Sequence, residues 1–102
     1  MEGKDFDIAK NIKMTENLQC QMLSAVSQFF SAMQENAAKA EKAEILAELE
    51  IVMYLLAARM GISKETLDQK AVAKLKLGLL QEERPEWKTS LLELHRELGL
   101  KM

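Results

Sequence analysis

Apolar residues recur every three or four positions over the first third of the chain, which is the spacing of one face of an α-helix. Charged and amide side chains separate them. The apolar positions are Ile8, Ile12, Thr15, Leu18, Met22, Val26, Phe29 and Met33. Residues 1 to 5 show no such period, so we expect them to be frayed. The pattern therefore predicts a first helix from about residue 8, with an apolar stripe along one side.

The first helix is expected to end at Asn36, because asparagine adopts the left-handed conformation that closes a helix more readily than most residues. The following segment is rich in Ala, Lys and Glu and is a strong helix former, so one continuous rod is the alternative. We favour an antiparallel hairpin, since a rod would leave its apolar side uncovered. A second helix is predicted from about Ala40 to Met60.

The later part of this second helix, residues 51–58, is apolar on every side, so it must be covered by helices of the same chain or of another copy. Gly61 is expected to end the helix, and Ser63 to cap a third one from about Lys64 to Gln81. Pro85 suits the first turn of a fourth helix, along which Trp87, Leu91, Leu94 and Leu98 form an apolar stripe. The pattern predicts an all-α helical bundle of about four helices around an antiparallel hairpin.

The first two helices carry more apolar surface than one hairpin covers, so we expect a homo-oligomer, either a dimer or a tetramer. We place the interface on both helices. The predicted interface residues are Met22, Val26, Phe29, Phe30, Ile51, Val52, Tyr54 and Leu55.

The composition agrees with a helical fold, and it argues against a sheet protein, a nucleic-acid-binding protein and a membrane-spanning protein. With 102 residues the chain fits a single domain, residues 1–102. Four glycines, one proline and five aromatic residues are few for a sheet protein. A net charge of −2 disfavours binding to nucleic acid, and no apolar run is long enough for a membrane span. We expect a cytoplasmic protein.

Its single cysteine, Cys20, is expected to be a small buried residue.

Acidic residues near the start of the second helix are the first candidates for chemistry. Glu41, Glu44 and Glu48 are three and four residues apart, so they share a helix face, and Glu50 follows closely. Carboxylate oxygens are the ligands that Mg²⁺ prefers. A solvated acidic face is the alternative, because the helix dipole favours anions at this end.

The stretch from Leu49 to Leu67, with Tyr-Leu-Leu, Gly-Ile and then Lys70 and Lys74, resembles the MazG-like all-α nucleoside triphosphate pyrophosphatases. The resemblance covers roughly residues 15 to 85. It implies a helical-bundle oligomer in which four acids hold Mg²⁺ against the phosphates of a nucleotide. On this interpretation Lys70 and Lys74 bind phosphate.

Matching the family's acidic motifs to this chain position by position leaves most of the acids missing. Glu50 stands where the family has an aspartate, and Ala47 occupies the partner position. The residues at the first motif are Gln21, Met22, Ala25 and Gln28. Neutral side chains bind a hard cation weakly, so the resemblance predicts the family's fold without its full metal site.

Residues 53–72 also look like the turn of a helix-turn-helix DNA-binding motif. Against this, Lys70 falls where that motif needs an apolar residue, and Glu65 and Asp68 would face the polyanion.

Our leading hypothesis is a non-catalytic MazG-like bundle that serves as a binding or assembly module and needs no cofactor. The competing hypothesis is a Mg²⁺-dependent nucleotide pyrophosphohydrolase with a reduced site of Glu44, Glu48 and Glu50. DNA binding is the third and least favoured.

Overall fold

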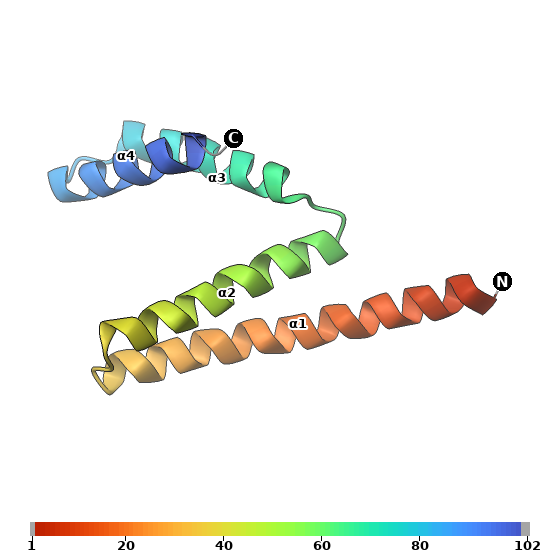
Figure 1. Ribbon diagram of the computed structural model, residues 1–102. Helices are drawn as coiled ribbons and strands as arrows, with labels where there is room; N and C mark the ends of the chain where they lie inside the picture. Colours follow the sequence, from red (N-terminus) through yellow and green to blue (C-terminus); the bar gives the residue numbers. More distant parts are fainter. Residues whose placement is uncertain (1, 101–102) are drawn as a thin grey trace. The chain divides into compact units, whose positions relative to one another are not determined.

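Four helices and no strand make up residues 2–100, which are the residues that the computed structural model describes, with side chains from Asp7 to Leu100 (Figure 1). The helices are α1 (Glu2–Gln34), α2 (Lys39–Arg59), α3 (Lys64–Gln81) and α4 (Pro85–Leu100). The predicted all-α fold with four helices is confirmed. Of the segment predicted to fray, Met1 lies outside the described residues, and the backbone is helical from Glu2. Within residues 2–100, no helix combines the length and the hydropathy needed to span a membrane.

The chain divides into two compact units, one up to Gly61 with α1 and α2, the other from Ile62 on with α3 and α4. Whether the whole chain behaves as a single domain stays a prediction.

The first unit is an antiparallel hairpin in which α2 runs back along α1 (Figure 1). Asn36 has a φ of +53°, the left-handed conformation predicted for it. The N–H of Ala37 donates to the carbonyl of Ala32 at 2.9 Å, and that of Asn36 to Met33 at 3.3 Å. This pair of bonds is the Schellman motif that satisfies the last carbonyls of a helix. The predicted hairpin is therefore confirmed over the continuous rod.

The contact between α1 and α2 is centred on small residues. Leu18, Ala25 and Ala32 are seven residues apart and buried on α1, and Val52 of α2 is 1% exposed. Alanines at this spacing let two helices approach closely, as in a coiled-coil seam. The predicted stripe is shifted from this seam, because Ile8, Ile12 and Met33 are about half exposed. The apolar surface of α1 is wider than the strip that one neighbouring helix covers.

The end of α2 and the start of α3 lie where the sequence predicted them, at Gly61 and Ser63. Gly61 has a φ of +80°, and its N–H donates to the carbonyl of Ala58 at 3.1 Å. A residue with a Cβ adopts this conformation at a cost, so glycine is favoured here. The Ser63 hydroxyl accepts a hydrogen bond from the Thr66 N–H at 3.1 Å, which is the predicted N-cap.

The second unit is a smaller pair of helices, α3 and α4, joined by residues 82–84. Its half-buried side chains on α3 include Leu67, Ala71, Leu75 and Leu79, which follow one another at intervals of four. On α4 they are Leu91, His95 and Leu98. The predicted stripe of α4 is thus partly wrong, because Trp87 is 53% exposed and Leu94 is about half exposed, while His95 takes the inner position between Leu91 and Leu98.

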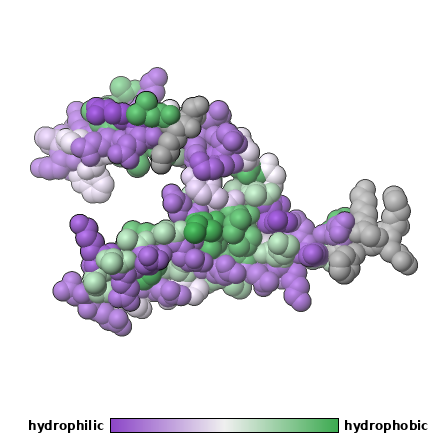
Figure 2. Space-filling view, viewed as in Figure 1, coloured by the Kyte–Doolittle hydropathy of each residue, from purple (hydrophilic) through white to green (hydrophobic). Residues whose placement is uncertain are grey.

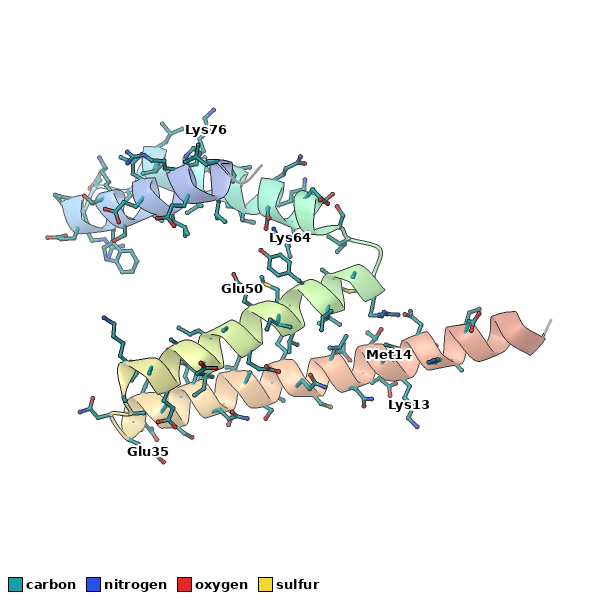
Figure 3. The ribbon with its side chains drawn as sticks, viewed as in Figure 1. Lys13, Met14, Glu35, Glu50, Lys64 and Lys76 are labelled. Atoms are coloured by element: carbon teal, nitrogen blue, oxygen red, sulfur yellow. The ribbon has the colours of Figure 1, made fainter. Side chains whose placement is uncertain are left out.

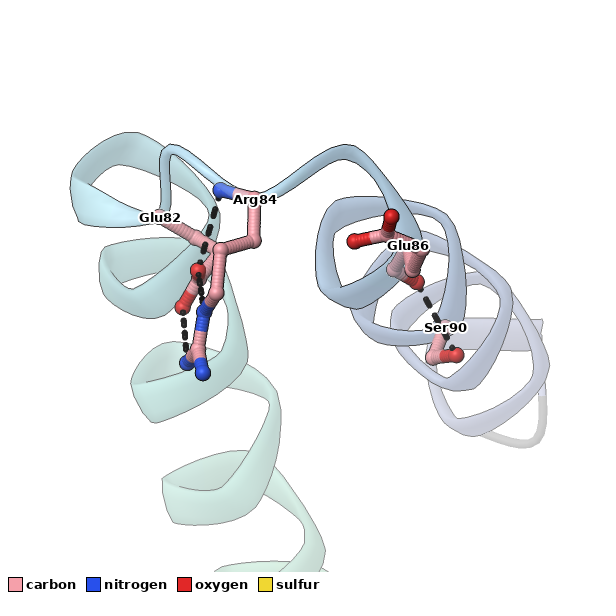
Figure 4. Close-up of polar contacts among 4 residues, drawn as sticks. All are labelled: Glu82, Arg84, Glu86 and Ser90. Atoms are coloured by element: carbon pink, nitrogen blue, oxygen red, sulfur yellow. Dashed lines mark hydrogen bonds and ion pairs between the residues drawn. The ribbon is translucent and has the colours of Figure 1, made fainter.

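A short polar cluster orders the connection between α3 and α4. Glu82 accepts hydrogen bonds from the backbone N–H of Arg84 at 3.1 Å and from its Nε at 2.7 Å (Figure 4). The same guanidinium lies 5.0 Å from the centroid of the Trp87 ring, within the range of a cation–π contact. Trp87 therefore packs against a charged side chain at the surface rather than in a core.

Candidate functional site

The predicted metal-binding carboxylates do not gather at one place. Glu44 and Glu48 are four residues apart and share a face of α2, whereas Glu50 points from the side of α2 turned away from α1 (Figure 3). All three are exposed. Among the side chains from Asp7 to Leu100, no group of three or more His, Cys, Asp or Glu residues is placed to hold a metal ion. The structure brings together two of the three predicted ligands.

Amide side chains stand on α1 at positions where the family resemblance expects acids. Gln21 lines a surface hollow together with Leu55 of α2, and Gln28 lines another with Glu41. Gln28 also donates a hydrogen bond to the hydroxyl of Ser24 at 3.1 Å. Both hollows lie along one groove between α1 and α2. The side chains that line them show which side of each helix borders this groove.

This groove extends to the open end of the hairpin. Two adjoining hollows of about 220 and 400 Å³ share Met14 and Arg59 in their walls. The guanidinium of Arg59 reaches across from α2 and donates a hydrogen bond to Oδ1 of Asn11 on α1 at 3.4 Å. The residues that line the two hollows, which we call the Arg59 groove, are Asp7, Lys10, Asn11, Met14, Asn17, Leu18, Gln21, Leu55 and Arg59.

Sequence reasoning missed this groove, because its residues are far apart along the chain and individually ordinary. One signal was present, since Arg59 is the single charged residue between Ile51 and Ile62.

The opposite side of the hairpin carries exposed apolar residues. Successive helix residues turn by about 100°, so residues two apart point to nearly opposite sides of a helix. Leu23 stands two residues after Gln21, and Met53 stands two residues before Leu55. Since Gln21 and Leu55 border the groove, Leu23 and Met53 border the other side.

Further residues continue this second surface at helical spacing, and Leu23 and Phe30 are its most exposed members on α1, at 73% and 64%. Figure 2 shows one face of the hairpin, on which hydrophobic and hydrophilic residues are mixed. We call this surface the apolar face. Its residues are Ile12, Leu23, Phe30 and Met33 of α1, and Leu46, Met53 and Met60 of α2. Exposed large apolar side chains that gather on one side of a protein mark sites of interaction.

The structure divides the predicted interface residues into four groups. Val52 is buried inside the hairpin and is not available to a second copy. Four others are half-buried, namely Met22, Val26, Phe29 and Tyr54. Phe30 belongs to the apolar face. Leu55, which is about half exposed, lines the groove, and the equally exposed Ile51 is four residues before it and so shares its side of α2. Part of the segment 51–58 thus stays uncovered in a single chain.

The two lysines predicted to bind phosphate, Lys70 and Lys74, are exposed and lie four residues apart on α3. The DNA-binding hypothesis would place Asp68 against the polyanion. Asp68 is 6% exposed, and its carboxylate is 2.7 Å from the Lys64 ammonium. A carboxylate with such a charged partner is tolerated away from water, so it does not bear on DNA binding as the sequence suggested.

Cys20 was expected to be buried, and this is also wrong. Its side chain is exposed on α1, because the seam is centred on Leu18 and Ala25 and position 20 points away from both.

A sequence model of the MazG-like family matches residues 8–91. The chain belongs to the MazG-like family. The MazG-like match runs from the second turn of α1 to the middle of α4 and includes the whole of α2 and α3. It relates these helices to the nucleotide pyrophosphohydrolases. Neither a curated protein nor a solved structure matches the chain.

Proposed function

We propose that this MazG-like chain is a binding and assembly protein that associates with a second copy of itself through the apolar face and does not hydrolyse nucleotides. The observation that carries the proposal is the exposure of Leu23 and Phe30, seven residues apart on one side of α1. Two hairpins that pack through such a stripe form a four-helix bundle.

Burial energies support association through this surface. Moving a Leu or Phe side chain fully out of water contributes about 1.5–3 kcal/mol. In a two-fold symmetric pair each side chain contributes twice, because both copies present the same surface. The large apolar residues of α2 beside them, Leu46 and Met53, widen the contact.

The distribution of acids supports a non-catalytic role. A hard cation needs several oxygen ligands with negative charge among them. Glu44 and Glu48 are on one face of α2, Glu50 is on another, and Gln21 and Gln28 supply neutral oxygens. Such a set holds Mg²⁺ weakly between the phosphates of a nucleotide.

Size-exclusion chromatography with light scattering tests the assembly. At micromolar concentration we expect the mass of two or four chains. A stable monomer would overturn the proposal.

The competing function is Mg²⁺-dependent nucleotide hydrolysis by Glu44 and Glu48 with Glu50. The observation that favours it is the common face of Glu44 and Glu48, bordering the side of the hairpin where Gln28 lies. Pyrophosphate release from a panel of nucleoside triphosphates with Mg²⁺ or Mn²⁺ tests it, with Glu50→Gln as the control. If the wild-type chain releases pyrophosphate and Glu50→Gln abolishes that release, nucleotide hydrolysis replaces the non-catalytic function that we propose.

A further inference from the structure

Two helices of this chain each carry a pair of like charges four residues apart. Glu44 and Glu48 are exposed on α2, and Lys70 and Lys74 are exposed on α3. Like charges at this spacing are neighbours on a helix and destabilise it slightly. In the part of the chain that the structure describes, none of the four side chains forms an ion pair. Each pair is therefore suited to charges of opposite sign at the same spacing.

Both charged pairs continue into an exposed apolar residue at the same interval. On α2, Ile51 follows Glu48 by three residues and is 54% exposed. On α3, Leu77 follows Lys74 by three residues and is 56% exposed. Intervals of four and three keep residues on one side of a helix, so each set forms a stripe. We call them the acidic stripe, which is Glu44, Glu48 and Ile51, and the basic stripe, which is Lys70, Lys74 and Leu77.

The two stripes match along their whole length when the helices that carry them run in the same direction. In this parallel arrangement each glutamate lies opposite a lysine, and Ile51 lies opposite Leu77. In an antiparallel arrangement with the same charge pairs, Leu77 lies opposite Glu41, which places an apolar side chain against a charge. The charges and the apolar residues together therefore favour parallel packing.

The length of the connection between α2 and α3 decides which chain supplies the matching stripe. With the stripes parallel and in register, Lys64 is level with Ala38, and Arg59 is about 32 Å away along α2 at 1.5 Å per residue. Residues 60–63 join Arg59 to Lys64 and span at most about 18 Å when fully extended. One chain therefore cannot bring its own two stripes together in this way, and a second copy has to supply one of them.

We propose that the basic stripe of one copy packs in parallel on the acidic stripe of a second copy, in a contact that joins dimers into a tetramer. In a two-fold symmetric pair the contact occurs twice, because both copies carry both stripes. The acidic stripe lies on the groove side of α2, since Ile51 stands four residues before Leu55. The apolar face is on the other side of the hairpin and stays available for the dimer.

The tetramer rests on the proposed function, the association through the apolar face. Exposed ion pairs are individually weak and are screened by salt, so the stripes alone do not hold two single chains together. Between dimers that have already formed, the contact occurs at several points at once, and each point strengthens the others. We therefore expect a tetramer at low salt that separates into dimers at high salt.

Light scattering of charge-reversed variants tests the contact. The acid-reversed variant is Glu44→Lys with Glu48→Lys, and the base-reversed variant is Lys70→Glu with Lys74→Glu. At about 50 mM salt, where screening is weak, we expect the mass of four chains for the wild type and of two chains for each variant alone. An equimolar mixture of the two variants returns to four chains, because the stripes of each then meet opposite charges on the other. At about 500 mM salt the wild type has the mass of two chains.

The matched control is Lys76→Glu with Lys88→Glu. It changes the net charge by the same amount as the base-reversed variant, and both of its lysines are exposed. Lys76 is two residues after Lys74 and so points to another side of α3, and Lys88 is on α4. We expect this control to keep the mass of four chains at low salt. Circular dichroism checks that every variant keeps the helix content of the wild type.

A wild-type chain with the mass of two chains at low salt overturns the contact and leaves the proposed function in place. The contact is also overturned if either charge-reversed variant keeps the mass of four chains, if their mixture stays at two, or if the control falls to two as well. A wild-type monomer contradicts the association through the apolar face, and the tetramer with it.

Discussion

The amide N–H of Ala37 donates a hydrogen bond to the carbonyl oxygen of Ala32, 2.9 Å away, and so closes α1. This bond spans the residue that reverses the chain, Asn36, and allows α2 to return along α1. The Arg59 groove and the apolar face are the two sides of the resulting hairpin, so both depend on this turn.

Substitutions at Asn36 test the turn. Its φ of +53° favours glycine, and a residue with an ordinary side chain costs roughly 1–2 kcal/mol there. We expect Asn36→Gly to keep or raise the free energy of unfolding, and Asn36→Ala to lower it by about 1 kcal/mol. Urea unfolding followed by circular dichroism measures both. Equal losses in the two variants would contradict the role given to the left-handed conformation.

The seam is tested by changing the volume of its residues. Val52→Ala removes two buried methyl groups and is expected to lower the free energy of unfolding by about 2 kcal/mol. Ala25→Leu inserts a large side chain where the helices are close, at a cost of roughly 1–3 kcal/mol. Ile51→Ala, next to Val52 but 54% exposed, is the control and costs less. A larger loss from Ile51→Ala than from Val52→Ala would place the seam on another side of α2.

Local signals in the sequence predicted the hairpin and its boundaries, because each depends on a few adjacent residues. Asn36 and Gly61 have the left-handed conformations that end α1 and α2, and Ser63 caps α3. The position of the seam was not predictable in the same way. Nothing local distinguishes the stripe through Ala25 from the one through Phe30, since both repeat at helical spacing and only the packing of α2 selects between them.

The link between Glu82 and Arg84 predicts a pH effect. The side-chain hydrogen bond from Arg84, with that from its backbone N–H, holds the pKa of Glu82 below its ordinary value of 4.5. The same bond raises the pKa of Arg84. A depressed carboxyl pKa contributes stability that is fully present above 4.5 and is lost as the pH falls through the lower, folded-state value. The contribution is small, because the pair lies at the surface.

An NMR titration of the side-chain carboxyl carbon checks this effect directly. We expect Glu82 to titrate below 4.5 in the wild-type chain and to return toward 4.5 in Arg84→Gln. A titration of Glu82 that is the same in both would show that Arg84 is not its partner in solution.

The candidate site was less accessible to sequence reasoning than the fold. The spacing of Glu44 and Glu48 correctly placed them on one face, but Glu50 is two residues after Glu48 and points elsewhere. The pairing of Arg59 with Asn11 joins residues 48 positions apart. Such a pairing depends on the register of two packed helices, which hydrophobic patterns alone do not determine.

The mass of the chain in solution, measured by light scattering for two matched double variants, tests the central claim most directly. Leu23→Glu with Phe30→Glu places two charges on the apolar face, and Ser24→Glu with Ser31→Glu places the same charges one residue further along the same helix. The account predicts that the wild-type chain and the serine variant are oligomers of the same mass, and that the first variant is a helical monomer. An oligomer of unchanged mass in the first variant, or a wild-type monomer, would contradict it.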